Sequence, residues 1–99
     1  MLVYKTMIIV IKILSIGIIN IMNGEIDEIH RKLCLKIKME RTKRNWSQIQ
    51  LADFAQINKN SVGSIERNDN SPTAYMLIKL ALAFGISLSE LTDISKITL

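Results

Sequence analysis

The sequence of 99 residues contains one cysteine, Cys34, and one histidine, His30. A single cysteine excludes an intramolecular disulfide framework and is typical of proteins from a reducing compartment. One cysteine and one histidine are also too few for a Cys/His zinc cluster, which needs about four ligands. The four glycines lie singly, so there is no glycine-rich phosphate loop. We therefore expect no metal and no cofactor, and the residues give no support to an enzymatic function.

His30 and Cys34 are four positions apart, so on a helix they would share one face. They are the residue types of a Cys–His nucleophile pair. Because the sequence has no other catalytic feature, the simpler interpretation is a half-buried cysteine beside a surface histidine.

Apolar residues are concentrated at the N-terminus. Residues 1–22 contain 16 apolar residues, whereas about 42% of residues 23–99 are apolar. We interpret the chain as an apolar N-terminal extension at 1–22, a domain at 23–93 and a C-terminal tail at 94–99.

Four interpretations of the extension are open. A membrane-spanning helix needs about 20 apolar residues, but Lys5, Lys12 and Asn20 weigh against it, so we do not expect a membrane partner. A signal peptide needs a small-residue cleavage site, which is absent. The extension could instead be an added element used in dimerisation. Alternatively, the translation start could lie at Met22, with residues 1–21 absent from the native protein.

The formal net charge of +4 is unevenly distributed, because residues 31–44 carry seven Lys or Arg residues against one acid, Glu40. Such a run is most often a solvated helix face, but it can also attract phosphate groups. The charge alone does not distinguish the two.

Hydrophobic spacing is helical throughout residues 23–93, with no strand pattern. A first helix is predicted from an N-cap at Asn23 to about Arg44. Its buried face is formed by apolar residues three and four positions apart, namely Ile26, Ile29, Leu33 and Ile37.

Two short helices are predicted next. One begins at Ser47, where Ser-Gln-Ile-Gln fits a capping box, and ends near Ala55. The other spans about 58–67, with Asn58 as its N-cap. Apart from Val62 and Ile65 this helix is polar or small, so its outer face is available for a role other than burial.

Two further helices complete the pattern. Ser71-Pro72 predicts the N-cap and first position of a largely apolar helix that ends at Gly85. Ser87-Leu88-Ser89-Glu90 fits a second capping box, opening a short helix with Leu88 and Leu91 buried.

A set of these residues matches a known family in register. They are Ser47, Gln48, Leu51, Ala52, Ala55, Ile57, Val62, Ile65, Glu66, Arg67, Ser71, Pro72, Leu80, Ala81 and the run 84–91. The sequence resembles the Cro/CI-type (XRE) helix-turn-helix family of bacterial and phage regulators. The resemblance covers residues 29–92 and implies an all-α, five-helix, lambda-repressor-like DNA-binding domain.

Three residues depart from the family pattern. Gln56 stands in the turn where glycine is usual, so it must adopt either a strained left-handed backbone or a different turn, at a cost on the order of 1 kcal/mol. Asn68 replaces the glycine that commonly follows the third helix. Gly63 lies inside that helix, where it removes one side chain and leaves room for close approach to DNA.

The resemblance also implies site residues. The third helix, 58–67, would lie in the major groove with its N-terminal part facing base edges. Its base-reading candidates are Lys59, Asn60 and Ser64. Candidates for phosphate contact are Gln48, Ser61, Arg67, Asn68, Lys43 and Arg44. Family members often pair an arginine of the first helix with the glutamate at the position of Glu66, so we favour a structural Arg41–Glu66 ion pair, although Arg41 could also contact phosphate.

The function implied by the resemblance is sequence-specific binding of double-stranded DNA by a cytoplasmic transcriptional regulator, expected to be a repressor. One recognition helix reads few base pairs, so we expect a homodimer on a near-palindromic operator. Two alternatives use the same domain, namely the antitoxin of a toxin–antitoxin pair, with a toxin as partner, and a restriction–modification controller protein.

Overall fold

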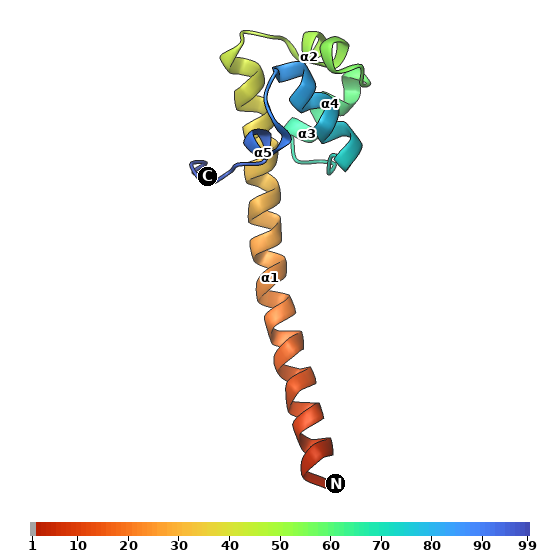
Figure 1. The fold of residues 1–99 in the computed structure, drawn as a ribbon, viewed down its shortest axis with the longest axis vertical. Coiled ribbons are helices and arrows are strands. Elements are labelled where there is room, and N and C mark those ends of the chain that lie inside the picture. The colour runs from red at the N-terminus through yellow and green to blue at the C-terminus, as the bar shows by residue number, and fades with distance from the viewer. Residues whose placement is uncertain (1) are drawn as a thin grey trace.

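The computed structural model describes the backbone of residues 2–99 and the side chains of residues 6–11 and 23–99. Five helices follow one another along the chain: α1 (Leu2–Lys43), α2 (Gln48–Ala55), α3 (Lys59–Glu66), α4 (Ala74–Phe84) and α5 (Leu88–Leu91). No strand occurs between residues 2 and 99. Helices α2 to α5 pack around the C-terminal part of α1, whose remainder projects from this head (Figure 1). The predicted all-α, five-helix fold is confirmed.

The N-cap predicted at Asn23 is wrong, because α1 is one continuous helix of 42 residues. An N-cap requires a non-helical backbone at the start of a helix. The residues before Asn23 contain no proline, so nothing there interrupts the i to i−4 hydrogen bonds. The side chains of Lys5, Lys12 and Asn20, on which the interpretation of the extension depends, lie outside the described residues.

The predicted buried face of α1 holds only from Leu33 onward. Ile37 is fully buried and Leu33 packs against the core, whereas Ile26 and Ile29 are 54% and 51% exposed. The difference arises because the other helices pack against only the C-terminal part of α1, and the rest of α1 projects away from them (Figure 1).

The core takes small and apolar side chains from every helix. They are Cys34 and Ile37 of α1, Leu51, Ala52 and Ala55 of α2, Val62 and Ile65 of α3, Leu80, Ala81 and Phe84 of α4, and Leu91 of α5. Burial of these side chains supplies the main favourable free energy of folding. Ile97, in the predicted tail, is also buried.

Two details of the last helices differ from the prediction. The N-cap of α4 is Thr73 rather than Ser71, because the Thr73 hydroxyl accepts a hydrogen bond from the Met76 amide at 3.1 Å. Pro72 therefore precedes the cap. Leu88 is 42% exposed because α5 has a single turn, which turns only Leu91 fully into the core.

Other predicted helix ends are confirmed. Ser47 and Asn58 cap α2 and α3, and Gly85 ends α4 with a left-handed backbone. The Ser87 hydroxyl accepts from the Glu90 amide at 3.0 Å, but the Glu90 carboxylate does not accept from the Ser87 amide, so only half of the second capping box forms. Over the described residues, no helix has both the length and the hydropathy needed to cross a membrane.

Candidate nucleic-acid interface

The α2–turn–α3 unit is fixed by local polar contacts at both ends of α2. Ser47 and Gln50 form a reciprocal capping box. The Gln50 backbone amide donates to the Ser47 hydroxyl at 3.0 Å, and the Ser47 backbone amide donates to Gln50 Oε1 at 2.8 Å. At the other end Gln56 adopts the left-handed conformation, one of the two alternatives expected there, with φ 57°. Its backbone carbonyl accepts a hydrogen bond from Lys79 of α4 at 3.0 Å. The turn is thereby held against α4 despite its backbone strain.

Helix α3 has one face in the core and one polar face in solvent. Val62 and Ile65 are buried. The predicted base-reading residues Lys59 and Asn60 are exposed, and Ser64 is partly buried. Because Asn58 caps the helix through the Asn60 amide at 2.8 Å, the first turn of α3 is ordered where both exposed readers lie.

The predicted phosphate-contacting residues fall into two groups. Gln48, Arg67, Asn68 and Lys43 are exposed, whereas Ser61 and Arg44 are partly buried. Gln48 begins α2, and Asn68 follows α3 with a left-handed backbone of φ 61°.

Arg41 and Glu66 lie together, as the resemblance implied. The Arg41 guanidinium bonds both Glu66 carboxylate oxygens, at 2.6 and 3.0 Å, and also donates to the Trp46 carbonyl at 2.6 Å. The Gln48 amide donates to the same carboxylate at 2.8 Å. The hydrogen bond to Glu66 raises the pKa of Arg41 above its ordinary value. Since its side chain is only 3% exposed, Glu66 is kept off the surface.

Gly63 is buried although it lies in the middle of α3. The side chains of Arg67 and Gln48 cover it, since a Cβ atom placed on Gly63 would lie 2.9 Å from Arg67 Nη1 and 3.4 Å from Gln48 Oε1. The sequence indicated the missing side chain, but not that Arg67 fills its place.

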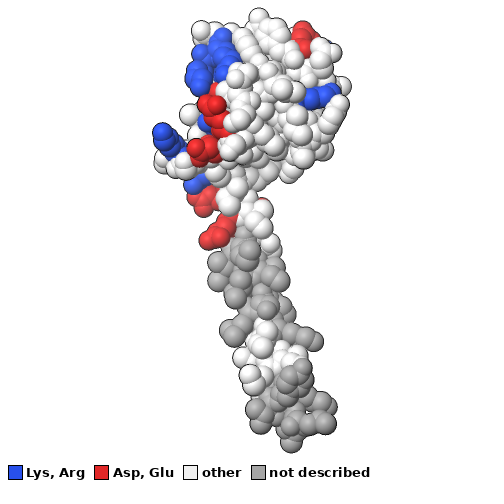
Figure 2. Space-filling model, in the orientation of Figure 1, with Lys and Arg blue, Asp and Glu red and all other residues white. Residues whose placement is uncertain are grey.

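The basic stretch at residues 31–44 is largely neutralised inside the protein. Five of its seven basic side chains form ion pairs: Lys32 with Glu28, Arg41 with Glu66, and Lys36, Lys43 and Arg44 with Glu40. Figure 2 shows basic side chains gathered where α1 ends, with acidic side chains beside them. The stretch is therefore a weaker phosphate footprint than its sequence suggests.

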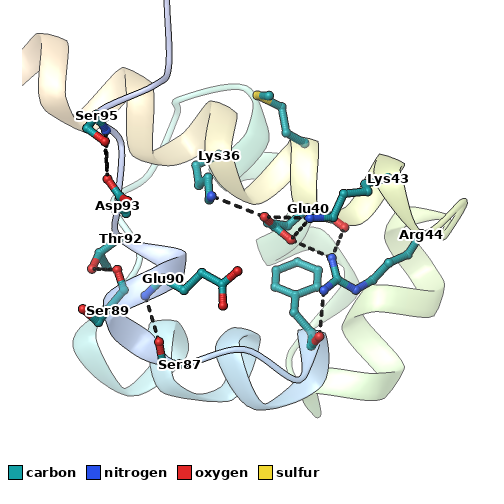
Figure 3. A network of polar contacts seen from close by, with 12 residues as sticks. Lys36, Glu40, Lys43, Arg44, Ser87, Ser89, Glu90, Thr92, Asp93 and Ser95 are labelled. Atoms are coloured by element: carbon teal, nitrogen blue, oxygen red, sulfur yellow. Dashed lines mark hydrogen bonds and ion pairs between the residues drawn. The ribbon is translucent and has the colours of Figure 1, made fainter.

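Glu40 is the centre of this network (Figure 3), a role that its position as the one acid in a basic stretch did not predict. Its carboxylate lies 3.3 Å from Lys36 Nζ, 3.1 Å from Lys43 Nζ and 2.7 Å from Arg44 Nη1. Burial opposes its ionisation, but hydrogen bonds from these three cations outweigh burial and lower the pKa of Glu40 from 4.5 to about 2. The signal in the sequence was basic residues at positions −4, +3 and +4 from Glu40.

Arg44 joins the end of α1 to the end of α4. Its guanidinium donates to the carbonyl of Glu40 and to that of Phe84, each at 2.7 Å. It also lies 4.8 Å from the centroid of the Phe84 ring. In the free protein this arginine is therefore engaged in holding two helices together.

Cys34 is buried more deeply than predicted. Its sulfur lies 3.7 Å from His30 Nε2 and donates to Asn68 Oδ1 at 3.6 Å. Burial raises the pKa of the Cys34 thiol above 9.0, which disfavours the nucleophilic thiolate. In the part of the chain with described side chains, no group of three or more His, Cys, Asp or Glu residues could hold a metal ion.

Comparison with known proteins shows which family this chain belongs to. The helix-turn-helix family model HTH_3 matches residues 37–91, which include the end of α1 and all of α2 to α5. The HTH-type transcriptional regulator SutR of Escherichia coli K12 is 35% identical over 63 residues, a match that covers 64% of this chain. This chain spans 35% of the length of SutR.

A solved structure is similar over the same region. The restriction-modification controller protein C.AhdI from Aeromonas hydrophila matches with a TM-score of 0.60 and 29% identity, over 63% of this chain and 94% of that one. The family model covers more than half of the chain. The protein therefore belongs to the XRE-type helix-turn-helix family.

Proposed function

We propose that the protein is a transcriptional regulator that binds double-stranded DNA sequence-specifically, with α3 in the major groove. The observation that carries the proposal is the division of α3 into a core face and an ordered polar face. Because one face of such a helix stays packed in the core, the polar side chains on its other face can contact DNA without disturbing the fold. The similarity to SutR, a transcriptional regulator, supports the same function.

Lys59, Asn60 and Ser64 are the proposed base readers. A lysine can donate to guanine O6 and N7, and an asparagine can bond adenine at N6 and N7. Both are exposed at the start of α3, the end of a recognition helix that meets base edges.

Gln48, Ser61, Asn68 and Lys43 are the proposed phosphate contacts. Gln48 opens α2, whose N-terminal amides and positive dipole end favour an anion. Arg44, in contrast, already bonds two carbonyls and a carboxylate. We therefore assign Arg44 to holding α1 against α4.

The assembly on DNA is proposed to be a homodimer on a near-palindromic operator, acting as a repressor in the cytoplasm. Two copies of α3 would then occupy half-sites one helical turn apart, about 34 Å. A restriction–modification controller role is a second candidate, supported by the similarity to C.AhdI.

The proposal is tested by selecting bound fragments from random DNA and measuring their affinity at several salt concentrations. We expect an enriched palindromic sequence and an affinity that falls steeply with salt, because bound phosphates release counterions. The variant Lys59→Ala/Asn60→Ala should lose sequence preference more than affinity for random DNA. Lys38→Ala, which removes an exposed charge from α1, is the matched control. Failure to enrich any sequence, or binding unaffected by salt, would contradict the proposal.

A further inference from the structure

We propose that Gly63 positions Arg67 to read a guanine base, so that the arginine acts in place of a side chain at position 63. The inference rests on the proposed DNA-binding function and deepens it. It assigns base reading to Arg67, which the family resemblance implied to be a phosphate contact.

The Arg67 side chain fills the space beside Gly63 in which a side chain at position 63 would lie. A Cβ atom there would lie 2.9 Å from Arg67 Nη1, closer than real Cβ atoms approach a neighbour. The guanidinium of Arg67 therefore occupies the volume that any side chain at position 63 would need. Only glycine permits this placement.

The Arg67 side chain points back along α3 toward Gly63. Helical side chains lean toward the N-terminus and cover the turn before their own Cα atom. Arg67 directly follows α3, so its guanidinium returns over the middle of that helix instead of extending past its C-terminal end. This brings its positive charge toward the part of α3 that carries Lys59 and Asn60, where base edges are read.

The Arg67 guanidinium has one engaged nitrogen, Nε, and two nitrogens that can still donate hydrogen bonds. Arg67 Nε forms an ion pair with Asp69 Oδ2 at 2.9 Å, which orients the guanidinium but adds little stability, because 63% of the Arg67 side chain is exposed. Over the described residues, Nη1 and Nη2 make no hydrogen bond. Two parallel donors held in this way match O6 and N7 of guanine, which arginine bonds in a bidentate manner.

The neighbouring Gln48 limits where the guanidinium can lie. Its amide nitrogen is bound to Glu66 at 2.8 Å, and its Oε1 faces Gly63. Since Glu66 is in turn held by Arg41, the Gln48 side chain bounds one side of the space that Arg67 occupies.

The test compares Gly63→Ala, Arg67→Ala and the double variant against wild type, on a panel of operators with each base changed in turn. The operator comes from fragments selected by the wild-type protein. We expect wild type to prefer guanine at one position of each half-site, by roughly 5- to 100-fold. Gly63→Ala and Arg67→Ala should both lose this preference, and the double variant should be no worse than Arg67→Ala.

Two controls separate positioning from folding and from charge. Gly63→Ala should melt no lower than wild type, because alanine favours the helix and only the flexible end of Arg67 must move. Arg67→Lys keeps the charge but not the planar fork, so it should weaken the guanine preference, though less than Arg67→Ala does, while keeping the salt dependence.

Two outcomes would overturn the inference while leaving the proposed function intact. If Arg67→Ala weakens binding equally for every sequence, Arg67 contacts phosphate only. If Gly63→Ala keeps the guanine preference, the missing side chain does not position Arg67. If wild-type protein binds no DNA, the proposed function itself fails, which is a separate result.

Discussion

Arg41 and Glu66 form a two-bond ion pair across 25 positions of sequence, with Arg41 Nε 2.6 Å and Nη2 3.0 Å from the two carboxylate oxygens. The third guanidinium nitrogen bonds the Trp46 carbonyl, just before α2. One side chain of α1 thus connects the start of α2 to the end of α3. This connection joins α1, the segment before α2 and the end of α3.

Replacing Glu66 by alanine should lower the free energy of unfolding by about 3 kcal/mol, because it leaves the largely buried Arg41 without its carboxylate. The double variant Arg41→Ala/Glu66→Ala should lose less than the sum of the single variants. Urea unfolding of the four proteins measures the difference. Strictly additive losses would show that the pair contributes no coupling.

Lowering the pH should destabilise the fold through Glu40. Its pKa is lowered from 4.5 to about 2 in the folded protein, so its contribution is present above pH 4.5 and is lost as the pH falls toward 2. The full contribution is on the order of 3 kcal/mol. Unfolding measured between pH 7 and pH 2.5 should show a larger acid loss for wild type than for Glu40→Gln. Equal acid losses in the two proteins would exclude this role for Glu40.

A protein beginning at Met22 should keep the stability of the full chain to within about 1 kcal/mol. The core draws on α1 only from Leu33 onward, and Ile26 and Ile29 are already half exposed. Thermal unfolding at several protein concentrations tests this. A control that also removes residues 22–37 should not fold, because it deletes Cys34 and Ile37 from the core. A large, concentration-dependent loss on removing residues 1–21 would instead indicate that the extension joins copies of the chain.

Replacing Gln56 by glycine should raise the free energy of unfolding by roughly 1 kcal/mol, because a left-handed backbone strains any residue with a Cβ atom. Gln56→Ala, which retains the Cβ atom, should bring no such gain. Chemical denaturation of the three proteins gives the comparison. If Gln56→Ala also had a higher free energy of unfolding than wild type, the strain would come from the glutamine side chain beyond its Cβ atom.

The short helices were largely predictable because their ends depend on contacts within four residues. Ser47, Asn58 and Ser87 bond amides two or three positions ahead, so their roles can be inferred from sequence alone. Asn23 has equally good capping chemistry, and there the same reasoning failed. Capping acts only where the helix stops, and α1 does not stop there.

By itself, the sequence determined the helical pattern, the caps at Ser47, Asn58 and Ser87, and the match to the family. Each of these depends on residue order over a few positions. Only the tertiary structure decided which charges of the basic stretch are available and what fills the space above Gly63. Glu40 pairs with neighbours on its own helix, but it is buried by the packing of other elements. Whether Arg67 extends outward or returns over Gly63 beside Gln48 likewise depends on how α2 and α3 pack together.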